Sequence, residues 1–236
     1  MIKLAVNGCL GKMGQRILNL AFADSDFIVK ACMERPGHSE LNSKIGDVAV
    51  TDDLNVISAA DLVIDFSAPS AAMDLLAIAL KYKKPMVIGT TGLDAKQIDR
   101  LKSEAKVIPI VFSPNMSVGV NVLFALVKAG AEKLKDYQVS IIEEHHIHKK
   151  DAPSGTAKKL AEIVNAQVKS KIGDIQSIRE DEIIGNHQVK FESELDTIVL
   201  SHSAKTRDIF AMGALRAAKW IKDKPAGFFT MQDVLA

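Results

Sequence analysis

Five short, continuously apolar runs alternate with helix-like segments over the first 115 residues, and this alternation restricts the possible fold more than any other feature. Apolar runs without a polar period are typical of parallel strands covered on both faces. The runs are Lys3–Asn7, Phe27–Met33, Leu62–Phe66, Pro85–Gly89 and Val107–Phe112, and the helical segments are Gly11–Phe22, Ser70–Tyr82 and Asp94–Glu104. This order predicts an α/β fold with a Rossmann-like, doubly wound parallel sheet, and ligands bind such sheets at the carboxyl ends of the strands.

A different pattern begins at Met116. Val189 and Phe191 alternate with polar neighbours, which indicates a half-covered sheet rather than a buried parallel one. The expected elements are a helix over Met116–Leu134, a strand over Tyr137–His145, a helix from about Ser154 to Lys169, strands over Gln188–Glu194 and Thr197–Ala204, and a helix over Arg207–Lys222. We therefore expect a dinucleotide-binding domain over residues 1–115 with a C-terminal return at 205–236. Residues 116–204 would form a smaller α+β domain with an open mixed sheet, for substrate binding and oligomerisation.

Charge and composition exclude several classes of protein. The formal net charge of +1 and the absence of a basic run with interleaved aromatic residues argue against nucleic-acid binding. Cys9 and Cys32 lack CxxC spacing, so neither a disulfide framework nor a zinc ribbon is expected. No apolar run is long enough to span a membrane, and the chain starts with a strand pattern instead of a signal peptide. These features predict a cytoplasmic protein with no membrane partner.

A glycine loop follows the first expected strand, with the sequence Gly8-Cys9-Leu10-Gly11-Lys12-Met13-Gly14. Glycines at a strand-to-helix turn let the backbone approach a pyrophosphate, which then faces the amides of the helix N-terminus. Glu34 comes 20 residues after Gly14, at the end of the second strand, where a carboxylate can bind ribose hydroxyls. Arg35 beside it can pair with a 2′-phosphate. We therefore predict that both NADH and NADPH are used, although a simple strand-to-helix turn remains an alternative.

Two further strand ends carry small polar residues. Gly89-Thr90-Thr91-Gly92 follows one expected strand, and Ser113-Pro114-Asn115-Met116 follows another. Both segments would bring backbone amides to the carboxyl edge of the sheet, where the nicotinamide end of a dinucleotide lies. The same residues are also common in ordinary turns, so each segment alone is ambiguous.

The segment from Glu143 to Ala157 concentrates the reactive side chains of the second domain. It holds three of the six histidines, His145, His146 and His148, followed by Lys149 and Lys150, and then a Pro-Ser-Gly-Thr turn that opens a helix. Histidine is suited to proton transfer near neutral pH, lysine to binding a carboxylate, and the amides at Gly155 and Thr156 to anion binding. A pocket for a small dicarboxylate is favoured. The alternatives are a metal site, which the neighbouring lysines disfavour, and a solvated charged loop.

These motifs resemble the 4-hydroxy-tetrahydrodipicolinate reductase (dihydrodipicolinate reductase) family over essentially the whole chain. The resemblance is carried by the glycine loop, Glu34-Arg35, Ile64-Asp65-Phe66-Ser67, Ile88-Gly89-Thr90-Thr91-Gly92, Asn115-Met116-Ser117-Val118-Gly119-Val120-Asn121 and, most specifically, the run from His145 to Ala157. It implies NADH- or NADPH-dependent reduction of the cyclic condensation product of aspartate semialdehyde and pyruvate, for lysine and diaminopimelate synthesis. It also implies a cytoplasmic homotetramer that assembles through the sheet of the second domain.

The resemblance implies roles residue by residue. His145 matches the family's proton donor and acceptor, Lys149 its second proton donor, and His146, Gly155 and Thr156 its substrate-carboxylate contacts. The cofactor contacts would be Gly8, Cys9, Leu10, Gly11, Lys12, Met13, Glu34, Arg35, Gly89, Thr90, Thr91, Ser113, Pro114, Asn115 and Met116. No resident metal is implied. Lys12 stands where arginine is commoner, so the contribution of this side to NADPH binding is weaker.

Three other functions compete with this hypothesis. The first is another two-domain dehydrogenase of aspartate metabolism, such as a semialdehyde or homoserine dehydrogenase. A semialdehyde dehydrogenase needs a nucleophilic cysteine, whereas Cys9 and Cys32 lie in the glycine loop and at the end of the second expected strand. A nucleotide-sensing module without catalysis would not need the histidine–lysine cluster. A metal hydrolase would depend on bound zinc and would be sensitive to chelators.

Overall fold

The computed structural model describes residues 1–167, 172 and 175–236, which form two compact units. Unit 1 comprises Met1–Ser117 and Phe210–Ala236, and unit 2 comprises Val118–Ile209. The division thus falls at 117/118 and 209/210, a few residues beyond the domain limits expected from the sequence. Unit 1 is discontinuous in the chain because its last segment returns after unit 2 is complete.

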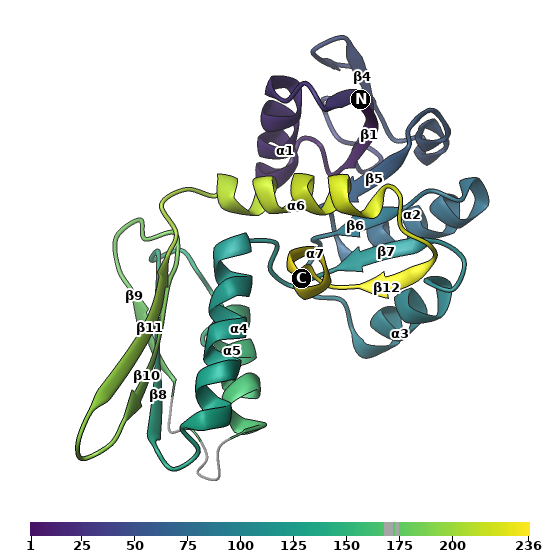
Figure 1. The fold of residues 1–236 in the computed structure, drawn as a ribbon. Helices are drawn as coiled ribbons and strands as arrows, with labels where there is room; N and C mark the ends of the chain where they lie inside the picture. The colour runs from purple at the N-terminus through teal and green to yellow at the C-terminus, as the bar shows by residue number, and fades with distance from the viewer. Residues whose placement is uncertain (168–171, 173–174) are drawn as a thin grey trace. The chain divides into compact units, whose positions relative to one another are not determined.

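Unit 1 is built on an eight-stranded sheet with the order β12-β7-β6-β5-β1-β2-β4-β3 (Figure 1). All of its pairings are parallel except that of β3 with β4. The strands are β1 (Ile2–Asn7), β2 (Phe27–Met33), β3 (Lys44–Ile45), β4 (Val48–Thr51), β5 (Leu62–Asp65), β6 (Met86–Ile88), β7 (Pro109–Phe112) and β12 (Gly227–Phe229). The chain moves one way from β1 to β2 and the other way from β5 to β7, so β1 and β5 flank the point where ligands bind in doubly wound sheets.

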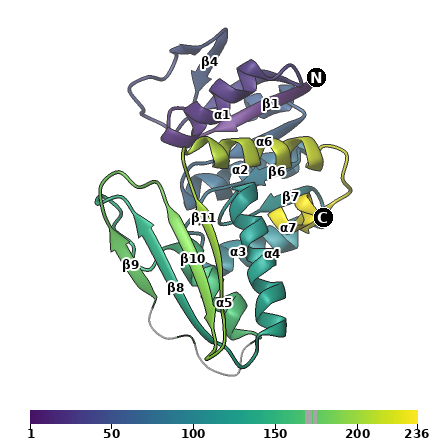
Figure 2. The ribbon, with the colours of Figure 1, turned by 60° about the vertical axis from the view of Figure 1, so that its left-hand side comes forward.

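Helices cover both faces of this sheet (Figures 1 and 2). They are α1 (Lys12–Ala23), α2 (Pro69–Tyr82), α3 (Ala95–Glu104), α6 (Asp208–Ile221), of which the part from Phe210 belongs to unit 1, and α7 (Met231–Leu235), with the 3-10 helix η1 (Leu54–Ala59) beside β2. Because both faces are covered, the central strands are apolar throughout: all four residues of β5 are buried. The predicted doubly wound parallel sheet is confirmed.

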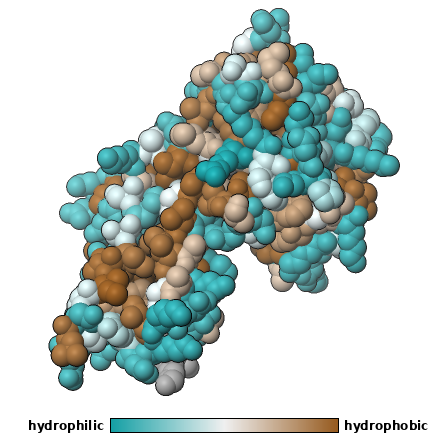
Figure 3. All heavy atoms as spheres, in the orientation of Figure 1, coloured by the Kyte–Doolittle hydropathy of each residue, from teal (hydrophilic) through white to brown (hydrophobic). Residues whose placement is uncertain are grey.

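Unit 2 contains a four-stranded mixed sheet with the order β11-β10-β8-β9. The strands are β8 (Gln138–His145), β9 (Gln176–Arg179), β10 (Asn186–Glu192) and β11 (Thr197–Ser203), and β9 is the one parallel to its neighbour. The helices α4 (Val118–Lys133) and α5 (Gly155–Asn165) pack on one face of this sheet and on each other (Figure 2). Figure 3 shows apolar residues along the visible face of this unit.

Strand period explains the core of unit 2. Three apolar residues face the helices and are 0–1% exposed: Ile141 on β8, and Val189 and Phe191 on β10. The residues that alternate with them on both strands face the other way. The expected mixed sheet with helices on one face is confirmed. The helix expected over Ser154–Lys169 starts as predicted but ends at Asn165, and its last two expected residues, 168 and 169, lie outside the described residues.

Several short elements differ from the expectation. The strands β3, β4, β9 and β12 and the helix α7 were not predicted, and the strand expected from Val107 begins two residues later, as β7. Val107 is 54% exposed because it belongs to the turn that follows α3. Among the described residues, none of the helices is both long and apolar enough to cross a membrane.

Candidate active site

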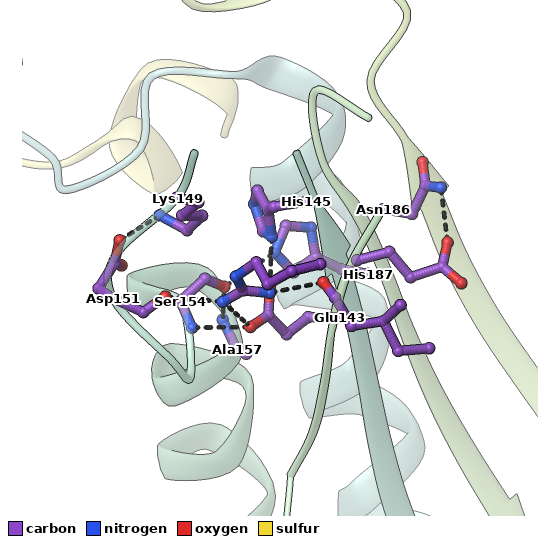
Figure 4. Close-up of polar contacts among 11 residues, drawn as sticks. Glu143, His145, Lys149, Asp151, Ser154, Ala157, Asn186 and His187 are labelled. Atoms are coloured by element: carbon purple, nitrogen blue, oxygen red, sulfur yellow. Dashed lines mark hydrogen bonds and ion pairs between the residues drawn. The ribbon is translucent and has the colours of Figure 1, made fainter. Parts of the chain in front are cut away.

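The reactive segment of unit 2 runs from the end of β8 to the start of α5. Because side chains alternate along a strand, Glu143 and His145 point to the same face of the sheet as Ile141, toward α5. Glu143 has no exposed surface and His145 is 9% exposed, so both side chains are buried. Figure 4 shows His145, Ser154 and His187 gathered around Glu143.

Both carboxylate oxygens of Glu143 have partners. Nδ1 of His145 forms a short hydrogen bond with Oε2 of Glu143. The other oxygen, Oε1, accepts hydrogen bonds from Nη2 of Arg179 at 2.7 Å and from the backbone N–H of Ser154 at 3.2 Å. A buried carboxylate therefore has a cation on one side and an imidazole on the other, the arrangement that makes burial of a charge tolerable.

Burial and neighbouring charges set the pKa values of these groups. Burial would raise the pKa of Glu143, but the hydrogen bond and charge of Arg179 and the charge of His145 hold it below its usual range. Burial lowers the pKa of His145; the carboxylate of Glu143 opposes this shift, and Lys149 and Arg179 add to it. His187 has a pKa lowered to about 3, chiefly by burial and then by the charge of His145. His187 is therefore neutral at physiological pH.

The remaining predicted residues of unit 2 lie on the loop and helix that follow. Nζ of Lys149 forms an ion pair of 2.7 Å with Asp151, and its side chain is 21% exposed. His146 is half-buried, and burial followed by the charge of Arg207 lowers its pKa. Gly155 is the first residue of α5, and the helix start is capped by Ser154, whose hydroxyl accepts from the N–H of Ala157 at 3.2 Å. A helix N-terminus of this kind favours an anion.

The cluster also contains atoms of the type that bind metals. Atoms of Glu143, His145 and His187 lie within 4.8 Å of one another. However, two of these groups are hydrogen-bonded to each other, and the remaining carboxylate oxygen already binds the guanidinium of Arg179. A divalent cation would have to displace one cation and approach a second at Lys149. The arrangement therefore favours proton transfer over metal binding.

In unit 1 the predicted glycine loop connects β1 to α1. The N–H groups of Gly8 and Cys9 donate to the carbonyl of Met33 at 2.9 and 3.0 Å, so the loop lies against the end of β2. Gly8 has a φ of +76°, and a Cβ on Gly14 would lie 2.0 Å from the Gly8 carbonyl oxygen. Both positions therefore require glycine. Gly11 caps α1 without a side-chain hydrogen bond, which suits the approach of an anion to the helix amides.

Glu34 lies at this same loop, as expected. Its Oε2 accepts from the N–H of Leu10 at 3.1 Å and its Oε1 accepts from the N–H of Arg35 at 3.0 Å. The side chains of Lys12 and Arg35 are exposed. A bent glycine loop, a helix start without a side-chain cap and an adjacent carboxylate fit the pyrophosphate and adenosine ribose of a dinucleotide.

A buried polar network joins the carboxyl ends of β1, β5 and β6. Asp65 has no exposed surface. Its carboxylate accepts hydrogen bonds from Nδ2 of Asn7, Oγ of Ser67 and Oγ1 of Thr90, each at 2.6 Å. The hydroxyl of Thr90 also accepts from the N–H of Ser67 at 2.8 Å. The network fixes the two loops that follow β5 and β6, at the ligand-binding edge of the sheet.

The comparisons with known proteins agree across both units. Residues 2–116 match the family model "Dihydrodipicolinate reductase, N-terminus", and residues 119–235 match "Dihydrodipicolinate reductase, C-terminus". The chain belongs to the dihydrodipicolinate reductase family. It is 40% identical to the 4-hydroxy-tetrahydrodipicolinate reductase of Trichlorobacter lovleyi, over 100% of this chain and 99% of that protein. The enzyme of the same name from Aquifex aeolicus is also 40% identical, over 99% and 98%.

A solved structure has the same fold. The dipicolinate-bound dihydrodipicolinate reductase from Paenisporosarcina sp. TG-14 aligns with a TM-score of 0.82 at 23% identity, over 98% of this chain and 97% of that one. As a member of the dihydrodipicolinate reductase family, this chain is an NAD(P)H-dependent oxidoreductase, and the dinucleotide fold expected from the sequence is confirmed.

The site also contains residues that were not selected from the sequence. Arg179 reaches Glu143 from β9 and His187 reaches Ser154 from β10, at 3.1 Å between its Nε2 and the serine Oγ. No local motif marks Arg179. His187 could have been found from the sequence, because it alternates with Val189 and Phe191 and so lies on the buried face of the same strand.

Some predicted cofactor contacts use their side chains elsewhere in this dihydrodipicolinate reductase fold. Thr90 binds Asp65 and is 2% exposed, and Cys9 is fully buried. The hydroxyl of Ser113 donates to the carbonyl of Asn115 at 2.8 Å. For these three residues, contact with a dinucleotide would be through the backbone.

Proposed function

We propose that this chain reduces 4-hydroxy-tetrahydrodipicolinate to tetrahydrodipicolinate with NADH or NADPH, as a step in lysine and diaminopimelate biosynthesis. The observation that carries the proposal is the buried pair of Glu143 and His145 beside Lys149 and the start of α5, in a chain of this family. Proton-transfer groups and anion-binding amides are thus brought together on one unit, as reduction of a small dicarboxylate requires.

The dinucleotide would be held by the predicted residues of unit 1, with the pyrophosphate at Gly8–Met13 and the adenosine ribose at Glu34. When bound, it supplies a hydride. Arg35 is exposed next to Glu34 and is the cation available to a 2′-phosphate, which supports the use of NADPH as well as NADH. The segments Gly89–Thr91 and Ser113–Met116 would contact the nicotinamide end through backbone groups.

The substrate would be held by unit 2. One carboxylate would bind the amides of Gly155 and Thr156 at the start of α5, and the other would bind His146 and the cationic loop. Loss of the 4-hydroxyl group as water gives a conjugated ring, and addition of a hydride to that ring leaves negative charge that one proton must neutralise. His145 or Lys149 would supply that proton, and the cationic surroundings of both would stabilise the charge as it develops.

A coupled assay tests the function directly. The substrate is generated fresh from aspartate semialdehyde and pyruvate by the condensing enzyme, and the absorbance of NADH or NADPH is followed at 340 nm after this protein is added. We expect consumption with each cofactor, dependent on the condensation step. Absence of consumption with both, by protein that binds NADH, would reject the function and favour a nucleotide-sensing module.

We further propose that the enzyme is a cytoplasmic homotetramer that assembles through the sheet of unit 2. The edge strand β11 leaves Ile198 and Val199 40% and 48% exposed, and an apolar sheet edge is typical of a surface that is covered in an assembly. Light scattering after gel filtration should give four times the 25.6 kDa chain mass. A monomer at micromolar concentration would contradict this assembly.

A further inference from the structure

Glu143 connects two parts of unit 2 that the proposed reaction needs at the same time. Through Oε2 it holds the imidazole of His145, and through Oε1 it holds the backbone N–H of Ser154, one residue before α5. We propose that Glu143 is a positioning residue: one buried carboxylate orients the proton donor and fixes the helix start that binds a substrate carboxylate. This inference rests on the proposed function, which gives Glu143 no role of its own.

The contact with His145 determines which nitrogen can react. A carboxylate only accepts hydrogen bonds, so Nδ1 of His145 carries the proton that faces Glu143. The exchangeable proton is then confined to Nε2. That nitrogen lies beside Gly185, where a Cβ would come within 2.9 Å of it. Any side chain at position 185 would therefore crowd Nε2 of His145, and glycine avoids this.

Arg179 makes this carboxylate suitable for the task. Its Nη2 lies 2.7 Å from Oε1 of Glu143 and also donates to the carbonyl of Asp151 at 2.6 Å. Arg179 and Glu143 cancel each other's charge while His145 is neutral, so the imidazole can give up its proton without leaving the buried carboxylate uncompensated. The charged groups that act on His145 are Glu143, Arg179 and Lys149, and the ring of the neutral His187 lies 5.1 Å away.

The helix start is held from two directions. The N–H of Ser154 is fixed by Glu143, and its hydroxyl caps α5 while contacting Nε2 of His187. Because His187 is neutral, its Nε2 can accept the serine O–H, which leaves the serine oxygen to accept from the N–H of Ala157. The first amides of α5 are thus rigidly placed relative to the imidazole of His145.

Glu143→Gln separates the two functions of the carboxylate. The amide oxygen can still accept from Arg179 and Ser154, while the amide nitrogen now faces Nδ1 of His145 as a donor. The imidazole proton is forced onto Nε2 and the imidazolium loses its stabilising charge, as when the acid of a catalytic triad is replaced by its amide. We expect kcat to fall about 100-fold or more, with the substrate KM within about twofold of the parent value.

Two further variants give opposite or additional effects. Glu143→Ala also releases the helix start, so it should raise the substrate KM as well as lower kcat. Arg179→Met removes a cation that opposes protonation of His145, so the limb of the pH–rate profile that requires protonated His145 should move to higher pH. In Glu143→Gln the same limb should move to lower pH, because the attraction of the carboxylate is lost.

Glu144→Gln is the matched control, since this neighbour faces the other side of β8 and its carboxylate accepts from Asn186 at 2.7 Å. Thermal unfolding, together with fluorescence titration of NADH, verifies that each variant is folded. Unchanged kcat and pH profile in Glu143→Gln, or shifts of the same sign in Glu143→Gln and Arg179→Met, would overturn the positioning role. An inactive parent enzyme would instead reject the proposed function.

Discussion

Replacement of Asp65 by asparagine tests the buried network at the ligand edge of unit 1. In the parent protein, Oδ1 accepts from Asn7 and Ser67, and Oδ2 accepts from Thr90. An asparagine oxygen can keep the first two hydrogen bonds, but its NH₂ group must face the hydroxyl of Thr90. That hydroxyl can accept the new hydrogen bond in addition to the one from the N–H of Ser67, which leaves its own proton without an acceptor.

The size of the effect follows from this unpaired proton. Thr90 is 2% exposed, so water cannot replace the lost acceptor, and an unsatisfied buried hydroxyl costs about 1–3 kcal/mol. For a protein of this length, about 2 kcal/mol corresponds to a fall of roughly 4–8 °C in the unfolding midpoint. Because the two affected loops border the predicted nicotinamide site, we also expect the KM for NADH to rise.

Differential scanning calorimetry and urea unfolding at pH 7 measure the change, with Asp74→Asn on the exposed side of α2 as the control. The control should shift the midpoint by less than about 1 °C. A midpoint of Asp65→Asn equal to or above that of the parent would refute the reasoning. It would mean that desolvation of the buried carboxylate, which raises its pKa, destabilises the folded protein by more than the three hydrogen bonds stabilise it.

Four further outcomes are expected. Lys149→Ala should lose about 2–4 kcal/mol of transition-state stabilisation, seen as a fall in kcat/KM, while NADH titration shows unchanged cofactor affinity. Gly14→Ala should abolish NADH binding in the same titration, because its Cβ would lie 2.0 Å from the Gly8 carbonyl oxygen. The free energy of unfolding, measured with urea, should fall as the pH drops below about 6.5, by up to about 1.4 kcal/mol per pH unit. The reason is that His187, with a pKa of about 3, stays neutral in the folded protein while it becomes protonated in the unfolded chain. His187→Gln should flatten this slope. Dialysis against a chelator should leave the reductase rate unchanged, because Arg179 already occupies the carboxylate that a metal ion would need, and a rate restored only by added zinc would contradict this.

The parallel sheet was predictable because its central strands are buried on both faces. Residues such as those of β5 are buried without interruption, and short runs of this kind between helical segments are typical of strands that helices cover on both sides. The edge strands were not predictable in the same way. Strand β3 has two residues and β12 has three, and they form only because β4 and β7 offer unpaired edges. Pairing of this kind depends on tertiary structure and leaves no local period.

The candidate site was predictable where it is contiguous in the chain. His145, Lys149 and the turn before α5 are close in sequence, so their types and spacing indicated proton transfer and anion binding together. The partners that tune them were not predictable, because Arg179 is placed by the register of β9 on β8, where it is paired with His145. Glu143 was visible in the sequence only as the first residue of the reactive segment, because its role depends on a guanidinium 36 residues away.

The discontinuity of unit 1 has a consequence for synthesis of the protein. Strand β12 pairs with β7 at the end of the eight-stranded sheet, yet it is translated after the whole of unit 2. Until residues 227–229 leave the ribosome, the backbone groups along one side of β7 have no strand partner, and an open parallel edge is a place where nascent chains associate wrongly. Unit 1 is thus begun first and completed last, since its sheet runs from β1 at Ile2 to β12 at Gly227–Phe229. Removal of about ten residues from the C-terminus should therefore delete β12 and destabilise the sheet of unit 1.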